Sequence, residues 1–464
     1  MKKIVALLFL CGCTLHPKYV RDARPMASEW RTQVDDTYMQ ECIGFWKQFQ
    51  DPVLDSLVNE ALANNQDLKV AIYRVKEYEA MYGIVRSQLF PQLNGSGDAG
   101  RLKLSENFIS TVPGIPFISN LFDLALNASY IVDIWGKVRS ETESAYAEVL
   151  AQVEVRRMVI IGVVTGVLST YVNMRQYDEQ LRIAEETRDT RIESFNLANT
   201  RFQLGLDSEM QPDQAKSEVE AAQVKVDRLK NAIALEENLL CLLLGKPSEK
   251  PARGKTIAQL VLPLGEPAYL PANMVNQRPD VLKAEQELIA ANADIGVARA
   301  RFLPEFNLAA SFGSQTSNLS NFFTSASSIW AYALSLMQEI FTGGKLTSQL
   351  KLANSTKMAM LHQYQGAILT GLKEINDALV SHKISRHLAL DQKQRVDTLA
   401  RYFQLATYQY KEGLTDYLTY LDAERHLFEA QIDAISALGY TFTTYISLFQ
   451  SMGGPWVLSC ETAL

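Results

Sequence analysis

The chain lacks the residue spacings that most enzymes use for metal or nucleophile chemistry. It has only five histidines, none of them four residues from another, and its five cysteines form no CxxC pair. HExxH, GxSxG and phosphate-binding glycine loops are missing as well. We therefore expect that the protein is not an enzyme and that it has no cofactor and no metal site. The alternative that stays open is an enzyme whose catalytic residues form no local sequence motif.

The sequence also lacks a basic excess and long apolar runs. Its 45 lysines and arginines stand against 52 aspartates and glutamates, a formal net charge of −7, which argues against nucleic acid as a partner. After the first dozen positions no run of 18 apolar residues occurs, and this argues against a membrane-spanning helix. A β-barrel is still compatible, because its strands alternate apolar and polar residues and leave bulk hydropathy near neutral.

Proline is absent from two long stretches, Gly136–Gly205 and Gly344–Gly413. Each stretch holds about 68 residues, which as one helix would span roughly 100 Å. A globular domain cannot bury so long a helix, so we expect coiled-coil packing against a returning helix. The returning helices carry apolar residues at alternating spacings of three and four: Ala215, Val219, Ala222, Val226, Leu229, Ile233 and Leu240 in the first, and Leu414, Leu418, Leu421, Phe428, Ile432 and Ile435 in the second.

An internal repeat organises the chain after residue 50. The segments around Pro91, Gly136 and Gly205 recur around Pro304, Gly344 and Gly413, with one offset for the last two pairs (344 − 136 = 208 and 413 − 205 = 208). Each copy predicts a helix, two strands, a very long helix, a glycine turn and a returning helix. The predicted boundaries are a signal peptide 1–12, an N-terminal segment 13–50, repeat one 51–250, a linker 251–275, repeat two 276–454 and a tail 455–464.

The predicted strands alternate with a period of two. From Phe122 to Val132 the even positions are apolar and the odd ones mostly polar, and copy two shows the same alternation in 306–312 and 330–336. So long an apolar face is typical of a strand that contacts lipid, and the polar face opposite it is typical of a water-filled lumen. A soluble hairpin is the alternative.

Four strands cannot close a barrel, and an open strand edge cannot lie in lipid. Three copies would supply about twelve strands, which is within the range of membrane barrels. The predicted fold class is thus an α+β membrane protein, a trimeric 12-stranded β-barrel continued by a long α-helical coiled-coil barrel. A periplasmic coiled-coil scaffold without a barrel is the structural alternative.

The N-terminus resembles a bacterial lipoprotein signal. Lys2 and Lys3 precede an apolar run, 4–10, and the run ends at a lipobox-like sequence whose modified residue would be Cys13. Cys11 is the weaker candidate because bulky residues precede it, and a plain signal peptide is the alternative. We expect an outer-membrane protein that is lipid-anchored and extends into the periplasm.

Three segments carry a family resemblance: Arg278–Val281 with Ala290–Pro304, Tyr130–Lys137, and Tyr417–Arg425. They resemble the NodT-like lipoprotein branch of the TolC-type outer-membrane efflux channel superfamily, whose members include OprM. The resemblance covers nearly all of the chain after the signal. It implies a homotrimer that carries small molecules out of the cell with a periplasmic adaptor and an inner-membrane pump, usually of the resistance-nodulation-division type. A TolC-like channel for protein secretion with an ABC-type pump is the alternative.

The resemblance also implies the functional residues. An aspartate nine positions after the turn glycine lies in the periplasmic gate of the family, and an apolar residue precedes it by one turn. The implied gate residues are Tyr410, Leu418, Asp422 and Arg425, and the implied adaptor-contacting tips are Gly205, Leu206, Gly413 and Leu414. Thr419 stands where TolC has a second acidic residue, which puts a double acidic ring in doubt, and Asp422 as a solvated helix charge is the alternative.

Overall fold

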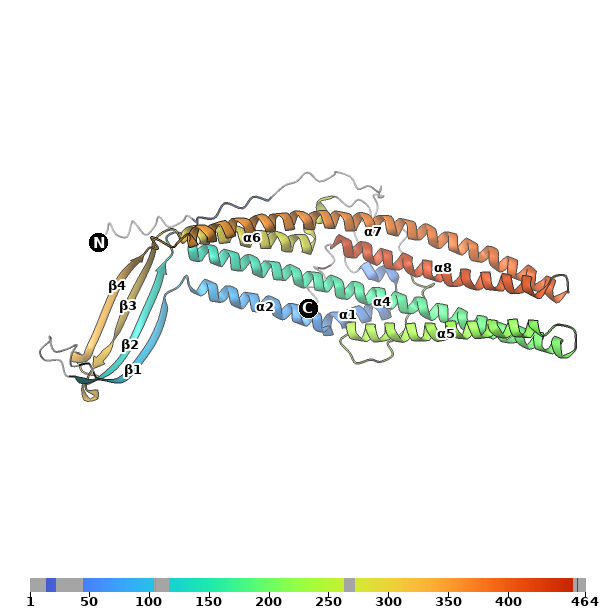
Figure 1. Ribbon diagram of the computed structural model, residues 1–464, viewed down its shortest axis with the longest axis horizontal. Helices are drawn as coiled ribbons and strands as arrows, with labels where there is room; N and C mark the ends of the chain where they lie inside the picture. Colours follow the sequence, from blue (N-terminus) through green and yellow to red (C-terminus); the bar gives the residue numbers. More distant parts are fainter. Residues whose placement is uncertain are drawn as a thin grey trace. The chain divides into compact units, whose positions relative to one another are not determined.

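A computed structural model describes residues 14–21, 45–103, 105, 117–262, 272–453 and 457. The predicted signal peptide with Cys11, the lipidation candidate Cys13, most of the segment that follows it and nearly all of the tail lie outside the described residues. The described elements follow the repeated order predicted from the sequence (Figure 1). A short helix, η2 (Phe45–Phe49), precedes copy one. Copy one comprises α1 (Pro52–Asn64), α2 (Gln66–Ser87), β1 (Gln92–Lys103), β2 (Ile118–Val132), α4 (Lys137–Gln203) and α5 (Met210–Leu243). Copy two comprises η3 (Ala272–Gln277), α6 (Pro279–Ala300), β3 (Glu305–Thr316), η4 (Leu319–Asn321), η5 (Ser325–Ser327), β4 (Ser328–Met337), α7 (Lys345–Lys411) and α8 (Tyr417–Met452).

The chain divides into two compact units, and both copies of the repeat contribute to each. Unit 1 takes its described residues from 1–23, 74–153 and 283–365, and it contains the sheet. Unit 2 takes its described residues from 24–73, 154–282 and 366–464, and it contains the helical hairpins. The helices α4 and α7 are each 67 residues long, and each has its first residues in unit 1 and the rest in unit 2.

The four strands of unit 1 form one antiparallel sheet in the order β1-β2-β3-β4. The register sets Leu126 of β2 opposite Phe312 of β3, and Phe312 opposite Trp330 of β4. Paired residues share a face of the sheet, so the apolar positions of three strands form one exposed apolar face. It comprises Leu124, Leu126, Leu308, Phe312, Trp330, Tyr332, Leu334 and Leu336.

The opposite face of the sheet is polar. Asn127 of β2 donates from Nδ2 to Oγ of Ser96 on β1 at 3.0 Å. Asp123 lies opposite Asp98 on β1 and Gln315 on β3. The alternation predicted for residues 122–132 is therefore present. Among the described residues, β1 and β4 each have one strand neighbour and leave their outer edges open.

A short N-terminal segment, residues 14–21, lies along α4 and α6 in unit 1. Asn292 donates from Nδ2 to the Pro17 carbonyl at 2.7 Å, and Arg299 donates to the Leu15 carbonyl at 2.9 Å. Gly296 makes room for the segment, because a Cβ there would lie 2.9 Å from the Cβ of His16. The segment is thus held by specific hydrogen bonds and by its close packing against Gly296.

The same segment also makes ionic contacts. His16 Nε2 lies 3.0 Å from a carboxylate oxygen of Glu143 on α4. Glu285 of α6 accepts from the Tyr19 hydroxyl at 3.1 Å and pairs with Arg21 at 2.6 Å. These contacts hold both ends of the segment against helices that follow it by more than a hundred residues.

In unit 2 the returning helices pack much as the heptad pattern predicts. In α5 six of the seven predicted seam residues are buried: Ala215, Ala222, Val226, Leu229, Ile233 and Leu240. Val219 is only half-buried, and Glu218 beside it is buried instead. The predicted seam of the second returning helix is wrong at its start, since Leu414 in the turn and Leu418 of α8 are exposed and Leu421 is the first buried leucine. Tyr417 and Tyr420 are buried there instead. Larger rings fill the space near the turn, and the leucines point away.

Helix α4 contains one window of 18 residues that is apolar enough to cross a membrane, with a mean hydropathy of 1.5. This departs from the expectation that no such segment follows the signal. Within the window, 56% is buried inside the protein. The apolar residues of a core helix pass the same test, so packing accounts for this composition.

Candidate functional site

Both long helices end in the same kind of turn. Gly205 and Gly413 each adopt a φ of +72°, a left-handed conformation that glycine reaches without a steric penalty. The next N–H bonds back to a carbonyl of the last helical turn: Leu206 to Arg201 at 2.9 Å, and Leu414 to Gln409 at 2.8 Å. Each turn therefore presents its leucine outward, with exposures of 67% for Leu206 and 73% for Leu414.

Next to the Gly413 turn lies a cluster of aromatic rings. Tyr410 of α7 stacks on Tyr420 of α8 with ring centroids 5.4 Å apart, and its ring is tilted against Tyr417 at 5.7 Å. The Arg201 guanidinium of α4 lies over the Tyr410 ring at 6.0 Å. Burial raises the pKa of Tyr410 and of Tyr420, so both phenols stay neutral. The cluster joins α7 and α8 through contacts between neutral rings, and it joins the end of α4 through the Arg201 cation over the Tyr410 ring.

Further along α8 an ion network links three helices. Arg191 of α4 bonds to Glu424 of α8 at 2.9 Å and to the Glu218 carboxylate of α5 at 3.1 Å. Arg425 of α8 donates from Nε to the same Glu218 carboxylate at 2.9 Å. Arg191, Glu218 and Glu424 are almost fully buried, with side-chain exposures of 6, 10 and 8%.

The network is held by pairing rather than by solvent. Burial raises the pKa of the Glu424 carboxyl, and the Arg191 charge beside it acts in the opposite direction. Arg191 also lies over the Phe428 ring at 5.5 Å and donates to the Glu218 backbone carbonyl at 3.0 Å. Buried charges are tolerated when they are paired and hydrogen-bonded in this way.

The four residues implied as gate residues fall into two groups. Tyr410 packs in the aromatic cluster, and Arg425 joins the ion network. Leu418 and Asp422, four residues apart on one face of α8, are exposed. The Asp422 carboxylate lies 3.4 Å from Nε2 of His426, one turn further along the same helix. One pair therefore contacts neighbouring helices, and the other faces away from the protomer.

Sequence reasoning missed Arg191, Glu218 and Glu424, because isolated charges on long helices are usually solvated. A signal was present for Glu424, which falls on the seam between Leu421 and Phe428. Arg191 had no comparable signal. Among the described residues no group of three His, Cys, Asp or Glu side chains is placed to hold a metal ion.

Comparison with known proteins identifies the family. The model of the family described as outer membrane efflux protein matches residues 57–246 and 270–454. The toluene efflux pump outer membrane protein TtgI of Pseudomonas putida is 34% identical over 464 residues, which is 98% of each chain. The cation efflux system protein CusC of Escherichia coli is 30% identical, and the alignment covers 97% of each chain. A crystal structure of CusC superposes with a TM-score of 0.84 at 29% identity, covering 95% of this chain and all of that one.

The chain therefore belongs to the outer membrane efflux protein family. It is an outer-membrane exit channel of a tripartite efflux system, and the family is one of transport channels. The predicted α+β channel fold, mostly helical with four strands in each protomer, is confirmed. The family resemblance drawn from the sequence is confirmed as well.

Proposed function

We propose that three copies of this chain close one twelve-stranded barrel in the outer membrane, and that their helices continue its lumen into the periplasm. The observation that carries this proposal is the sheet, which has one exposed apolar face, one polar face and two open edges. An open edge in lipid leaves backbone groups unpaired, and only closure with other copies removes both edges. Chemical crosslinking and native mass spectrometry in detergent test the assembly, and a monomeric or dimeric channel would contradict it.

The cargo is a small molecule or ion, delivered by an inner-membrane pump of the resistance-nodulation-division type through a periplasmic adaptor. The names of the relatives, a toluene efflux pump protein and a cation efflux system protein, support small cargo rather than a protein. The exposed Leu206 and Leu414 beside their turn glycines support the two tips as the adaptor contact.

A photocrosslinking amino acid tests the tips. Placed at Leu206 or Leu414, it should capture the adaptor in cells. Val224 in the middle of α5 is a matched control, because it is also an exposed apolar residue but lies away from either turn. Adaptor capture from position 224 alone would assign the contact to the helix flank.

Leu418 and Asp422 form the gate. In a trimer, three exposed leucines and three exposed aspartates on one face of α8 would form an apolar ring beside an acidic ring. Acidic rings favour cations, and apolar constrictions can close a pore by dewetting. Tyr410 and Arg425 hold α8 against its neighbours and keep the closed arrangement.

The chain is anchored by acylation of Cys13. The seated segment 14–21 supports an anchor near the sheet, because Thr14 packs against Gly136, which lies between the end of β2 at Val132 and the start of α4 at Lys137. A Cβ at Gly136 would lie 3.0 Å from the Thr14 Cα, so the fit is close. Mass spectrometry of the mature N-terminus should find a lipid-modified cysteine. An unmodified terminus that starts after residue 13 would contradict the anchor and leave the channel proposal standing.

A further inference from the structure

The returning helices α5 and α8 end in matching ways, and their ends reveal a second feature of the repeat. Each helix is followed by a glycine with positive φ, Gly245 at +69° and Gly453 at +59°. The two glycines have the offset that relates the hairpin turns (453 − 245 = 208). Next to each glycine another helix begins, α2 at Gln66 in copy one and α6 at Pro279 in copy two.

In copy one a neutral side chain joins the two helix ends. Asn65 donates from Nδ2 to the Leu243 carbonyl, the last residue of α5, at 2.8 Å. The Asn65 Oδ1 accepts from the Leu68 N–H in the first turn of α2 at 3.0 Å. Gly245 is needed for this approach, because a Cβ there would collide with the Asn64 carbonyl.

In copy two a charged side chain occupies the corresponding place. Arg278 immediately precedes α6 and donates to the Ser451 carbonyl in the last turn of α8. Ser451 is the repeat partner of Leu243 (451 − 243 = 208). A Cβ at Gly453 would lie 3.1 Å from the Pro279 Cδ, so this glycine also allows the helix ends to approach closely.

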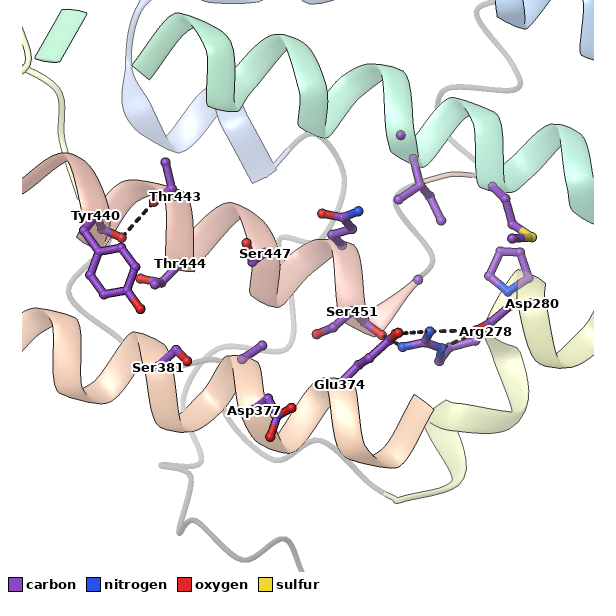
Figure 2. Close-up of a pocket in the computed structure, with 17 residues that line it drawn as sticks. Arg278, Asp280, Glu374, Asp377, Ser381, Tyr440, Thr443, Thr444, Ser447 and Ser451 are labelled. Atoms are coloured by element: carbon purple, nitrogen blue, oxygen red, sulfur yellow. Dashed lines mark hydrogen bonds and ion pairs between the residues drawn. The ribbon is translucent and has the colours of Figure 1, made fainter. Parts of the chain in front are cut away.

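Arg278 is held in place by two carboxylates. It bonds to Asp280 at 2.9 and 2.7 Å and to Glu374 of α7 at 2.5 Å (Figure 2). Arg278 itself is buried, whereas Glu374 is about half exposed. Both side chains line a cavity of about 600 Å³. Gly371 of α7 leaves space for the arginine, since a Cβ there would lie 3.1 Å from the Arg278 Cδ. The contact between helix ends in copy two is therefore ionic and borders a cavity, while the corresponding contact in copy one is made by the neutral amide of Asn65.

We propose that Asn65 and Arg278 are repeat-related positioning residues, and that Arg278 fixes the end of α8 remote from the gate. This inference rests on the proposed gate at Leu418 and Asp422. Helix α8 is 36 residues long, so a shift at one end is carried to the other. The ion network of Arg191 and Arg425 holds the first part of α8, and Arg278 holds its last turn. Two fixed points determine where the exposed face of α8 points.

The test compares Arg278→Gln with Asn65→Ala. Glutamine is uncharged and shorter than arginine, so it forms neither ion pair and holds the last turn of α8 less firmly. We expect Arg278→Gln to raise the conductance of the resting channel several-fold in planar bilayers. Asn65→Ala loosens α5, which carries none of the four proposed gate residues and is linked to them through the Glu218–Arg425 pair. It should lower thermal stability and change resting conductance less than Arg278→Gln does.

Two further variants keep the experiment decisive. If Arg278→Gln does not assemble, Glu374→Gln removes one ion pair from the half-exposed side and should raise resting conductance by a smaller factor. Amide hydrogen exchange of residues 448–452 gives a gate-independent reading and should speed up in both variants. Faster exchange with unchanged conductance would overturn the positioning role, provided that Leu418→Ala with Asp422→Ala does change conductance. If this double variant does not change conductance, the gate proposal itself has failed. The positioning role of Arg278 is then tested by hydrogen exchange alone, and unchanged exchange of residues 448–452 in Arg278→Gln would overturn it.

Discussion

The buried Arg191 guanidinium allows two carboxylates to leave water together. It bonds to Glu218 and Glu424 on different helices, and both are nearly as buried as the arginine. Removing one partner of such a network leaves an uncompensated buried charge. The effect of removing Arg191 therefore includes the cost of leaving two buried carboxylates without this positive partner, as well as the loss of its own bonds.

Arg191→Met should lower the free energy of unfolding by about 3–5 kcal/mol, the range for breaking a buried ion pair. Thermal dissociation of the solubilised protein and denaturant unfolding measure the loss. Arg395→Ala is the control, because Arg395 pairs with Asp433 at 3.1 Å where both side chains are about half exposed. Equal losses in the two variants would show that the network around Arg191 is solvated.

His382 makes the stability of the folded protein depend on pH. It is 1% exposed, and its Nε2 has no hydrogen-bond partner among the described residues. Burial, followed by the nearby Arg386 charge, lowers the pKa of His382 from 6.5 to about 4. The unfolded chain therefore takes up this proton first as the pH falls, and stability present above pH 6.5 is lost between 6.5 and 4.

The size of this loss follows from linkage. A shift from 6.5 to about 4 corresponds to on the order of 3 kcal/mol. His382→Phe keeps an aromatic ring beside Tyr445, whose centroid is 5.5 Å away, and removes the titration. Melting temperatures measured from pH 7 to pH 4 should fall more steeply in the wild type than in His382→Phe. Parallel curves would mean that His382 does not control the acid response.

At the scale of elements, the sequence predicted most of the architecture for physical reasons. The absence of proline and the two turn glycines predicted α4 and α7 with their ends, because a helix of that length has few other places to stop. Period-two alternation predicted the apolar face of β2. The ion network was not predictable in the same way, since Arg191 meets Glu424 across 233 residues and no local pattern records that contact.

The start of α8 shows the limit of a heptad pattern. The spacing treats Leu418 and Leu421 alike, yet only Leu421 is buried. Near the turn the seam is filled by Tyr417 and Tyr420, whose rings are larger than any leucine. Relative bulk decides such a choice, and spacing alone cannot express it.

The sheet makes a prediction about faces. Leu126→Arg places a charge on the apolar face, where arginine at a bilayer midplane costs about 2–4 kcal/mol. Asn127→Arg places the same charge one residue away on the polar face, beside Ser96. The yield of heat-modifiable trimers from membranes should drop strongly for the first variant and little for the second. Similar yields would show that the two faces are assigned wrongly.

At the scale of the whole molecule, the gate proposal predicts a leak. Leu418→Ala with Asp422→Ala removes both exposed rings, so single-channel conductance should rise and cation preference should weaken. Cells carrying the double variant should become sensitive to large antibiotics that normally do not enter. Unchanged conductance and selectivity in planar bilayers would remove these residues from the constriction.

The seated segment 14–21 has a consequence in time. Its hydrogen-bond partners Asn292 and Arg299 follow it by 275 and 284 residues. A ribosome adding about 5–20 residues each second makes those partners roughly 15–60 s after the segment itself. Throughout that interval the segment lacks its contacts with α6, and any modification of the chain's first residues that is complete by then takes place on a peptide that is not yet fully docked. Docking on α6 can occur only after synthesis has passed into the second copy, so it marks a late stage in the making of each new molecule.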